Sequence, residues 1–286
     1  MKDLSVPRHL HKFLATLGAS PHKRLGQHFL VDGNIARKII AAAVLQETDH
    51  VVEIGPGPGV LTELIYPHVQ HVIAVEKDPI FAEAISRFGE KISVVQADIL
   101  QCSFDRWAQQ EKVRSFVVIS NLPYYVTSPI LTSLLFQSGC ISRLVVMMQE
   151  EAAERLFHKK KGPLAVLLDI LFRRTQSFTV SRHCFWPKPH VNSQVIALEA
   201  TRLISAEKIP AFCRFVREAF RFPKKRLFRS LVCYYDEQKI CKTFSALQFC
   251  DSVRHQDLEA QMWIQLFYAL YSDGLDSNCE STHSVS

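Results

Sequence analysis

The 286-residue sequence has few of the residues that mark fibrous or low-complexity chains. It contains only 10 glycines and 13 prolines, which excludes collagen-like repeats. It also lacks a long apolar run, since stretches such as residues 39–45 fall far below the roughly 18 residues that a membrane-spanning helix needs. Residues 1–20 hold no apolar core of a secretory signal. We therefore expect a soluble protein that has no membrane partner.

Paired cysteines are absent as well. The eight cysteines form no Cys-x-x-Cys pair, which is the spacing typical of a zinc site or a redox motif. A secreted disulfide scaffold would be shorter and richer in cysteine. We therefore predict mostly buried, reduced thiols in a cytoplasmic protein, and no metal ion.

Acidic residues are scarce in one part of the chain. Residues 155–229 contain 17 Lys or Arg and 4 Asp or Glu, whereas the rest of the chain is net acidic. Clustered basic side chains neutralise phosphates and release their counterions. A face that binds a polyanion is one interpretation and an unevenly charged, solvated surface is the other. Charge alone does not decide between them.

Apolar runs typical of buried strands alternate with helical patterns. The runs lie at residues 51–54, 72–75, 92–95, 116–119 and 144–148, and helical patterns lie at 34–45 and 80–88. This alternation predicts an α/β fold whose mostly parallel sheet is covered by helices on both faces. Later strands at 178–180 and 194–198, joined by a proline-rich segment, predict an antiparallel strand at the end of the sheet.

The same patterns suggest how the chain is divided. Residues 1–20 form a polar, histidine-containing N-terminal extension, and residues 21–200 form the α/β domain. Helical patterns at 207–221, 224–234 and 254–271 predict a small all-α domain over residues 201–271. Residues 272–286 are rich in Ser and acidic residues, and we expect them to form a disordered tail.

Four predicted strands end in glycine or in polar residues. The turn that begins at Gly55 follows the first strand, and Glu76 ends the second strand 21 residues later. Asp98 follows the third strand and Asn121 ends the fourth. Since parallel strands end at one edge of a sheet, these residues outline a pocket there. Glu76 has the spacing of an acceptor for two ribose hydroxyls, and Asp98 is placed to accept from an adenine amino group, which predicts a nucleoside-bearing cofactor.

The tetrapeptide Asn121-Leu122-Pro123-Tyr124 carries the most chemical information. An exocyclic base amine is a poor nucleophile, because its lone pair is delocalised into the ring. The Asn121 side-chain oxygen and the Leu122 carbonyl can each accept one N–H of this amine. These hydrogen bonds favour a pyramidal amine nitrogen and direct its lone pair. Pro123 fixes φ and offers no competing donor, and Tyr124 offers a ring on which an extruded base can stack.

With these motifs the chain resembles the rRNA adenine N6-dimethyltransferases, S-adenosylmethionine-dependent enzymes of the kasugamycin-sensitivity type. The matching segments span about residues 21–231 and lie at 23–30, 53–59, 76–78, 96–98, 121–125, 149, 154–156 and 185–193. The combination of Gly-Gln-His-Phe-Leu with Asn-Leu-Pro-Tyr is far more specific than a lone glycine-rich turn. The resemblance implies a Rossmann-like class I methyltransferase sheet over residues 21–200 and a small RNA-binding helical domain after it.

The resemblance also implies which residues act. The cofactor, S-adenosylmethionine, would contact His28, Leu30, Gly55, Glu76, Asp98 and Asn121. The target adenine would be held by Asn121, Leu122 and Tyr124, with Phe185 closing over its other face. For Phe185 a plain core aromatic is the alternative, and the resemblance makes His28 a binding residue rather than a general base. The implied reaction is dimethylation of N6 in two adjacent adenines of small-subunit (16S) rRNA, by a monomer acting on a pre-ribosomal particle during ribosome biogenesis.

Two alternatives share the motifs. One is a large-subunit rRNA adenine methyltransferase that confers antibiotic resistance, and the other is a non-catalytic nucleic-acid-binding factor on the same fold. The intact Glu76, Asp98 and Asn121 argue against the second. The sequence also departs from the family pattern in a short basic loop at Lys159–Lys161 and at Pro223, which we expect in the first turn of a helix.

Overall fold

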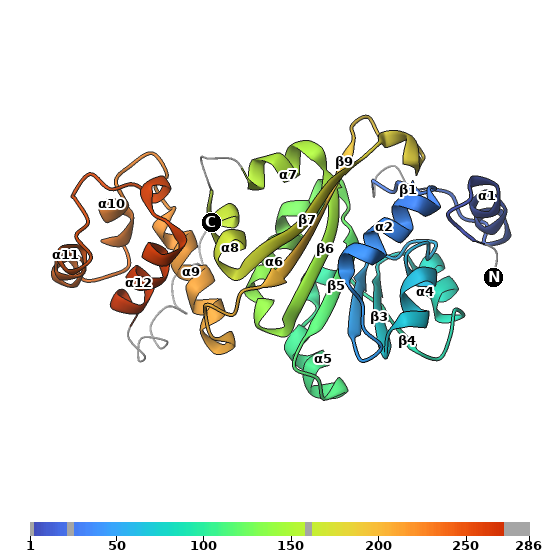
Figure 1. Cartoon of the computed structure of the whole chain (residues 1–286), viewed down its shortest axis with the longest axis horizontal. Coiled ribbons are helices and arrows are strands. Elements are labelled where there is room, and N and C mark those ends of the chain that lie inside the picture. The colour runs from blue at the N-terminus through green and yellow to red at the C-terminus, as the bar shows by residue number, and fades with distance from the viewer. Residues whose placement is uncertain (1–2, 22–25, 158–161, 272–286) are drawn as a thin grey trace, which may run out of the picture.

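The computed structural model describes residues 3–21, 26–157 and 162–271 of the chain. Its main sheet consists of β2 (His50–Ile54), β3 (His71–Glu76), β4 (Ile92–Gln96), β5 (Phe116–Asn121), β6 (Ile141–Gln149), β7 (Phe172–Val180) and β9 (Ser193–Ala200). The strand order is β4-β3-β2-β5-β6-β9-β7 (Figure 1). The strands from β2 to β6 run parallel, and β9 is antiparallel to both neighbours. The predicted sheet is confirmed, with its antiparallel strand one place inside the edge.

Helices cover both faces of this sheet. The helices of the described residues are α1 (Pro7–Thr16), α2 (Gly33–Ala43), α3 (Thr62–Ile65), α4 (Pro79–Ser86), α5 (Phe104–Glu111), α6 (Thr127–Phe136), α7 (Glu150–Leu156), α8 (Pro163–Leu171), α9 (Ile209–Ala219), α10 (Leu227–Leu231), α11 (Glu237–Ala246) and α12 (Ala260–Leu270). Val51 and Val52 of β2 are both fully buried, on opposite faces. Val51 packs in one apolar cluster with Ile39 of α2, and Val52 in another with Leu131 of α6. Burial on both faces explains why the strands are continuous apolar runs.

Strand β7 is longer than its sequence pattern predicts. It follows α8 directly and begins at Phe172, whereas the apolar pattern indicated only residues 178–180. Between the buried ends Phe172 and Val180, residues 173–177 are exposed. The strand lies at the edge of the sheet, where polar side chains face solvent and the apolar signal is lost.

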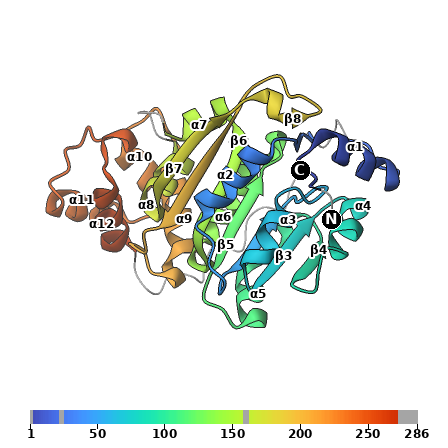
Figure 2. The same ribbon diagram turned by 45° about the vertical axis from the view of Figure 1, so that its right-hand side comes forward.

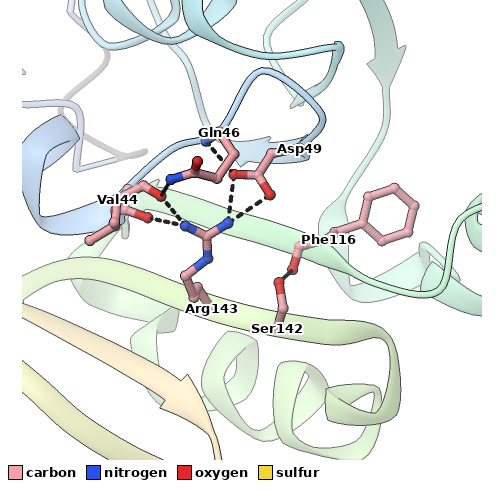
Figure 3. Close-up of polar contacts among 7 residues, drawn as sticks. Val44, Gln46, Asp49, Phe116, Ser142 and Arg143 are labelled. Carbon is pink, nitrogen blue, oxygen red and sulfur yellow. Dashed lines mark hydrogen bonds and ion pairs between the residues drawn. The ribbon is translucent and has the colours of Figure 1, made fainter.

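Arg143 of β6 fastens the end of α2 to the start of β2 (Figure 3). After α2, Val44 adopts a left-handed conformation with φ of 48°. The guanidinium group of Arg143 donates to the carbonyl oxygens of Ala43 and Val44 and to both carboxylate oxygens of Asp49, at 2.6 and 2.5 Å. Asp49 also accepts from the backbone nitrogen of Gln46 at 2.7 Å. A cation at a helix C-terminus with a bidentate carboxylate is a favourable arrangement, and it fixes the chain just before His50.

The N-terminal segment contains a helix that the sequence analysis did not predict. Helix α1 begins with Pro7 and presents the buried side chains of Leu10 and Leu14 to Phe29 and Phe81. The N-terminal extension predicted for residues 1–20 therefore contains a helix that packs on the rest of the chain. Leu10, Phe13, Leu14 and Leu17 recur at the spacing of one helix face, so the apolar stripe that marks this helix is present in the sequence.

Helices α9 to α12 lie together at the end of the molecule opposite α1 (Figure 1 and Figure 2). Helix α9 packs against α6 and α8, and Phe212, Phe215 and Trp263 belong to the same apolar cluster as the sheet. In the part of the chain described after Ala200, the elements are helical, as predicted. Helix α11 lies in a segment to which the sequence analysis assigned no element.

The position of Pro223 corrects one expectation. Helix α10 begins only at Leu227, so Pro223 and Lys224 lie in a turn before it rather than in the first turn of a helix. The turn is closed by a hydrogen bond from the Lys225 nitrogen to the Phe222 carbonyl at 2.9 Å. The basic side chains at residues 224–226 are therefore carried by an exposed turn.

Three further expectations concern the cysteines, membrane-spanning helices and segments that lie outside the described residues. The seven cysteines among the described residues are free thiols, as predicted, but only Cys213 is buried and three are exposed, so the expectation that most of them are buried is wrong. Each of the described helices is too short or too polar to cross a bilayer. The basic loop at Lys159–Lys161, the start of the first motif at 23–25 and the expected tail at 272–286 lie outside the described residues.

Candidate active site

A cavity lies at the carboxyl ends of β2, β3, β4 and β5. Its wall includes all but one of the residues predicted for the site: His28, Leu30, Gly55, Glu76, Asp98, Asn121, Leu122 and Tyr124. These residues come from five segments of the chain and meet because parallel strands end at the same edge of the sheet. The structure thus assembles the predicted pocket, and only Phe185 lies away from its wall.

The glycine-rich turn after β2 lets the backbone form the floor of the cavity. Gly55 and Gly57 have positive φ values of 67° and 54°, which side chains other than glycine adopt at a cost. A Cβ atom added at Gly55 would meet no protein atom within 4 Å. It would project into the space of the cavity, so the missing side chain leaves room for a ligand. At Gly57 an added Cβ would lie 3.2 Å from the ring of Phe29.

Glu76 is a buried carboxylate held by backbone donors. Its side chain ends β3 and is 7% exposed. One carboxylate oxygen accepts from the Gly57 nitrogen at 2.9 Å, and the other accepts from the Asp78 nitrogen at 2.8 Å. Burial raises the pKa of Glu76, while these backbone hydrogen bonds act in the opposite direction. Each oxygen keeps a further lone pair for a ligand hydroxyl.

A second acid, Glu53, lies beneath the same wall, and the sequence analysis quoted it without giving it a role. Its side chain is 2% exposed, and burial raises its pKa to about 8. The nearby Thr62 lowers the pKa in part, and the neighbouring Glu76 raises it further. A protonated Glu53 leaves Glu76 as the single negative charge of this pair.

Asp98 is an ionised acid at the rim of the cavity. One of its carboxylate oxygens accepts from the Leu100 nitrogen at 3.0 Å, and the other accepts from the Lys77 ammonium group at 3.0 Å. The Leu100 hydrogen bond and the Lys77 cation lower the pKa of Asp98. Asp98 therefore remains an acceptor at neutral pH, as its predicted contact with an adenine amino group requires.

Asn121 is oriented by the segment that carries His28. Its side-chain nitrogen donates to the His28 carbonyl oxygen at 3.2 Å, which leaves the side-chain oxygen as the free acceptor. The backbone nitrogen of Leu122 donates to the Met147 carbonyl at 2.9 Å and holds the tetrapeptide on β6. Pro123 has φ of −60° and ψ of 127°, an extended geometry that ends the strand before Tyr124 turns back.

Tyr124 is positioned by two contacts that the sequence did not reveal. Its hydroxyl group hydrogen-bonds with the hydroxyl group of Ser193, a fully buried residue of β9, at 2.7 Å. Burial raises the pKa of Tyr124, so its hydroxyl group stays neutral. The Tyr124 ring stacks on the ring of His28, with centroids 5.6 Å apart, and Nδ1 of His28 donates to the Pro187 carbonyl oxygen at 2.6 Å.

Phe185 is the predicted site residue that the structure does not bring to the cavity wall. It lies in β8 (Phe185–Trp186), which pairs with β1 (Phe29–Leu30) so that Phe185 faces Leu30. Its side chain is 3% exposed and belongs to the apolar cluster around α2. The core aromatic that we gave as the alternative describes this position. A role of Phe185 over the target base therefore has no support from its contacts.

The geometry defines the class of protein. The strand order, the glycine floor and the buried acid at the end of β3 are those of a Rossmann-like class I methyltransferase, a class for which S-adenosylmethionine is the methyl donor. The family can be given more narrowly. The model of the family described as ribosomal RNA adenine dimethylase matches residues 18–271, and the chain belongs to this family of enzymes.

Relatives with assigned names agree with this placement. The chain is 35% identical over 278 residues to the ribosomal RNA small subunit methyltransferase A of Protochlamydia amoebophila (strain UWE25), covering 93% of this chain and 97% of the relative. It is 37% identical over 252 residues to the protein of the same name from Chlorobium phaeobacteroides (strain BS1), covering 87% and 93%.

Two solved structures share the fold. One is a dimethyladenosine transferase from Plasmodium falciparum, with a TM-score of 0.68, 22% identity and coverage of 84% of this chain and 96% of that one. The other is the 23S rRNA methyltransferase ErmE, with a TM-score of 0.62, 23% identity and coverage of 85% and 99%. At these identities the similarity shows the common fold and does not identify the RNA that is modified.

Proposed function

We propose that this protein transfers methyl groups from S-adenosylmethionine to N6 of two adjacent adenines in small-subunit rRNA, each adenine being methylated twice. The observation that carries the proposal is the position of Asn121-Leu122-Pro123-Tyr124 on the wall of the cavity that also holds Gly55, Glu76 and Asp98. Relatives that are 35% and 37% identical over most of the chain are named small subunit methyltransferases, which supports this choice of RNA.

The residues present fit the cofactor. The open space above Gly55 accommodates a ligand against the backbone, and the buried Glu76 would accept from the two ribose hydroxyls. Asp98 would accept from the adenine amino group of the cofactor, and His28 and Leu30 would line its other side. When bound, S-adenosylmethionine supplies a methyl group on a sulfonium centre, which is a good leaving group.

The chain then has to align a weak nucleophile. The side-chain oxygen of Asn121, freed by the contact of its nitrogen with His28, would accept one N–H of the target amine, and the Leu122 carbonyl would accept the other. These acceptors favour a pyramidal nitrogen whose lone pair points toward the methyl group. The methylated amine loses a proton to solvent, so no strong base is required. Most of the rate enhancement then comes from positioning.

The target base would be held by stacking on Tyr124. The Ser193 hydrogen bond and the His28 ring fix the plane of the Tyr124 ring before the base arrives. A fixed aromatic face lowers the entropy cost of holding an extruded adenine. In this proposal His28 positions Tyr124 and the cofactor and takes no part in proton transfer.

The proposal also covers how the protein binds rRNA, its oligomeric state, and the particle and compartment in which it acts. The helical segment 201–271 and the basic turn at residues 224–226 would contact rRNA phosphates, while residues 21–200 hold the chemistry. We further propose that a monomer acts on a pre-ribosomal particle in the cytoplasm. Large-subunit rRNA is the alternative substrate, and the support for it is a solved structure whose 23% identity establishes the fold alone.

One experiment tests the substrate. Purified protein is given S-adenosylmethionine and, separately, unmodified small-subunit particles, naked 16S rRNA and large-subunit particles, and the products are digested and analysed by mass spectrometry. We expect two dimethyladenosines in small-subunit rRNA and none in large-subunit rRNA. Modification of large-subunit rRNA alone would establish the alternative, and no modification of any RNA would overturn the proposal.

A further inference from the structure

Two histidines and a glutamate meet at the edge of the sheet opposite the candidate active site. His50 is the first residue of β2, His71 is the first residue of β3, and the two pair directly in the parallel register. Glu111 is the last residue of α5 and reaches the same point. Since β2 is five residues long, this cluster lies roughly 15 Å from the glycine floor of the cavity. It plays no part in the proposed methyl transfer.

The distances match those between the ligands of one metal ion. A carboxylate oxygen of Glu111 lies 3.5 Å from Nδ1 of His50 and 3.1 Å from Nδ1 of His71. One ligand atom from each of the three residues lies within 4.8 Å of the other two. Ligands at about 2.0–2.2 Å from a tetrahedral zinc ion are separated by roughly 3.3–3.5 Å. The two separations from Glu111 are therefore close to those of a zinc site, and the third pair of ligand atoms lies within 4.8 Å.

The Nδ1 nitrogens of the two histidines are left unsatisfied. Among the described residues, Nδ1 of His50 and Nδ1 of His71 are buried and make no hydrogen bond, despite their proximity to Glu111. Two buried nitrogens facing one carboxylate are costly to leave unpaired.

Ser93 supplies the outer contact typical of a metal-binding histidine. Its hydroxyl group lies 2.9 Å from Nε2 of His71. When Nε2 donates to Ser93, the lone pair of Nδ1 is directed to the side of Glu111, which is the tautomer a metal ligand needs. Glu111 also stands at the C-terminal end of α5, where the helix dipole disfavours an acid. A cation between the three groups pairs the two Nδ1 nitrogens and offsets the unfavourable position of the Glu111 carboxylate at the helix end.

We infer that His50, His71 and Glu111 bind a divalent transition metal, with zinc as the ion that two imidazoles and one carboxylate suit best. Three protein ligands leave a fourth position for water. The ion joins α5 to the starts of β2 and β3 and stabilises the fold without entering the reaction. The absence of Cys-x-x-Cys spacing does not exclude such a site, because its ligands are distant in sequence and meet through strand pairing.

The test is zinc binding by the full chain after treatment with a chelator, measured by calorimetry. We expect one site in the wild type, with affinity about 100-fold weaker in Glu111→Gln and His50→Gln and about 10-fold weaker in Ser93→Ala. His68→Gln removes an exposed histidine near the start of β3 and is the matched control, expected to bind like the wild type. Saturating zinc should raise the melting temperature of the wild type by about 5 °C and leave that of Glu111→Gln unchanged.

Cobalt(II) separates this site from the exposed thiols of Cys233, Cys241 and Cys250. Nitrogen and oxygen ligands give weak visible bands without the strong near-ultraviolet thiolate band, and we expect that spectrum for the wild type. Zinc binding of equal affinity in Glu111→Gln and the wild type would place the ion elsewhere and overturn the inference. Lack of zinc binding by the folded wild type would also overturn it and would leave a hydrogen-bonded cluster.

Discussion

Glu53 should make the stability of the fold depend on pH in a defined direction. Its side chain is 2% exposed, and burial raises its pKa from 4.5 to about 8. Below the pKa that Glu53 has in the unfolded chain, the carboxyl group is protonated in both the folded and the unfolded state and contributes no pH dependence to stability. Between the two values the folded chain holds the proton that the unfolded chain has lost, so the free energy of unfolding falls as pH rises. Above about 8 the folded state is ionised too, and the decline ends.

The size of the effect follows from the shift. Each pH unit between the two pKa values costs about 1.4 kcal/mol, so Glu53 should remove about 3 kcal/mol of stability between about pH 5 and pH 7.5. Glu53→Gln keeps the shape of the protonated side chain and removes the titration. We expect the variant to exceed the wild type in unfolding free energy by about 3 kcal/mol at pH 7 and by less than about 1 kcal/mol at pH 5.

The assay is urea unfolding followed by tryptophan fluorescence, for wild type and variant, at several pH values in this range. Glu151→Gln, which alters an exposed acid on α7, is the control and should show a difference that does not change with pH. The difference between the two proteins isolates Glu53 from other titrating groups such as Glu76. A constant difference between wild type and Glu53→Gln across the range would refute the reasoning, because it would mean that Glu53 ionises as an ordinary carboxyl group.

Three further predictions concern the proposed reaction. Asn121→Ala should lower the methylation rate on the order of 100-fold, because it removes one acceptor for the target amine. The control Asn34→Ala, on the surface of α2, should leave the rate unchanged. Near wild-type turnover by Asn121→Ala would refute the aligning role. Glu76→Ala should weaken S-adenosylmethionine binding by roughly 1.5–3 kcal/mol in calorimetry, and unchanged affinity would place the ribose elsewhere. Replacing the cations at 224–226 with Gln should lower the slope of log rRNA affinity against log salt concentration by roughly 0.7–0.9 for each lost phosphate contact. The affinity for the cofactor should stay the same. An unaltered slope would indicate that these cations form a solvated surface without an RNA contact.

Much of the fold could be predicted because its signals are local. Runs such as residues 72–75 are apolar on both faces, and the helices between them impose a parallel sheet. The elements that were missed carry weaker signals. Helix α1 is only 10 residues long and carries its apolar stripe among basic and histidine side chains, and β7 has exposed polar residues because it lies at the sheet edge.

The candidate site divides in the same way. Gly55, Glu76, Asp98 and Asn121 could be predicted, since each directly follows or ends a strand and strand ends share one edge. The link between Tyr124 and Ser193 could not, because the two lie 69 residues apart and meet only after β9 inserts beside β6. The burial of Glu53 also depends on tertiary packing.

The apolar cluster that begins at Val52 in β2 continues through α6 and α8 to Leu270 in α12. Phe212 of α9 is fully buried in it, and the thiol group of Cys213 lies against the Leu135 carbonyl at 3.6 Å. A chimera made by exchanging the helical segment between two relatives would therefore need matching side chains on α6 and α8, not merely a junction near residue 201. Core packing thus limits the exchange of whole helical segments between relatives, whereas substitutions on the outer surface of the bundle leave this packing unchanged.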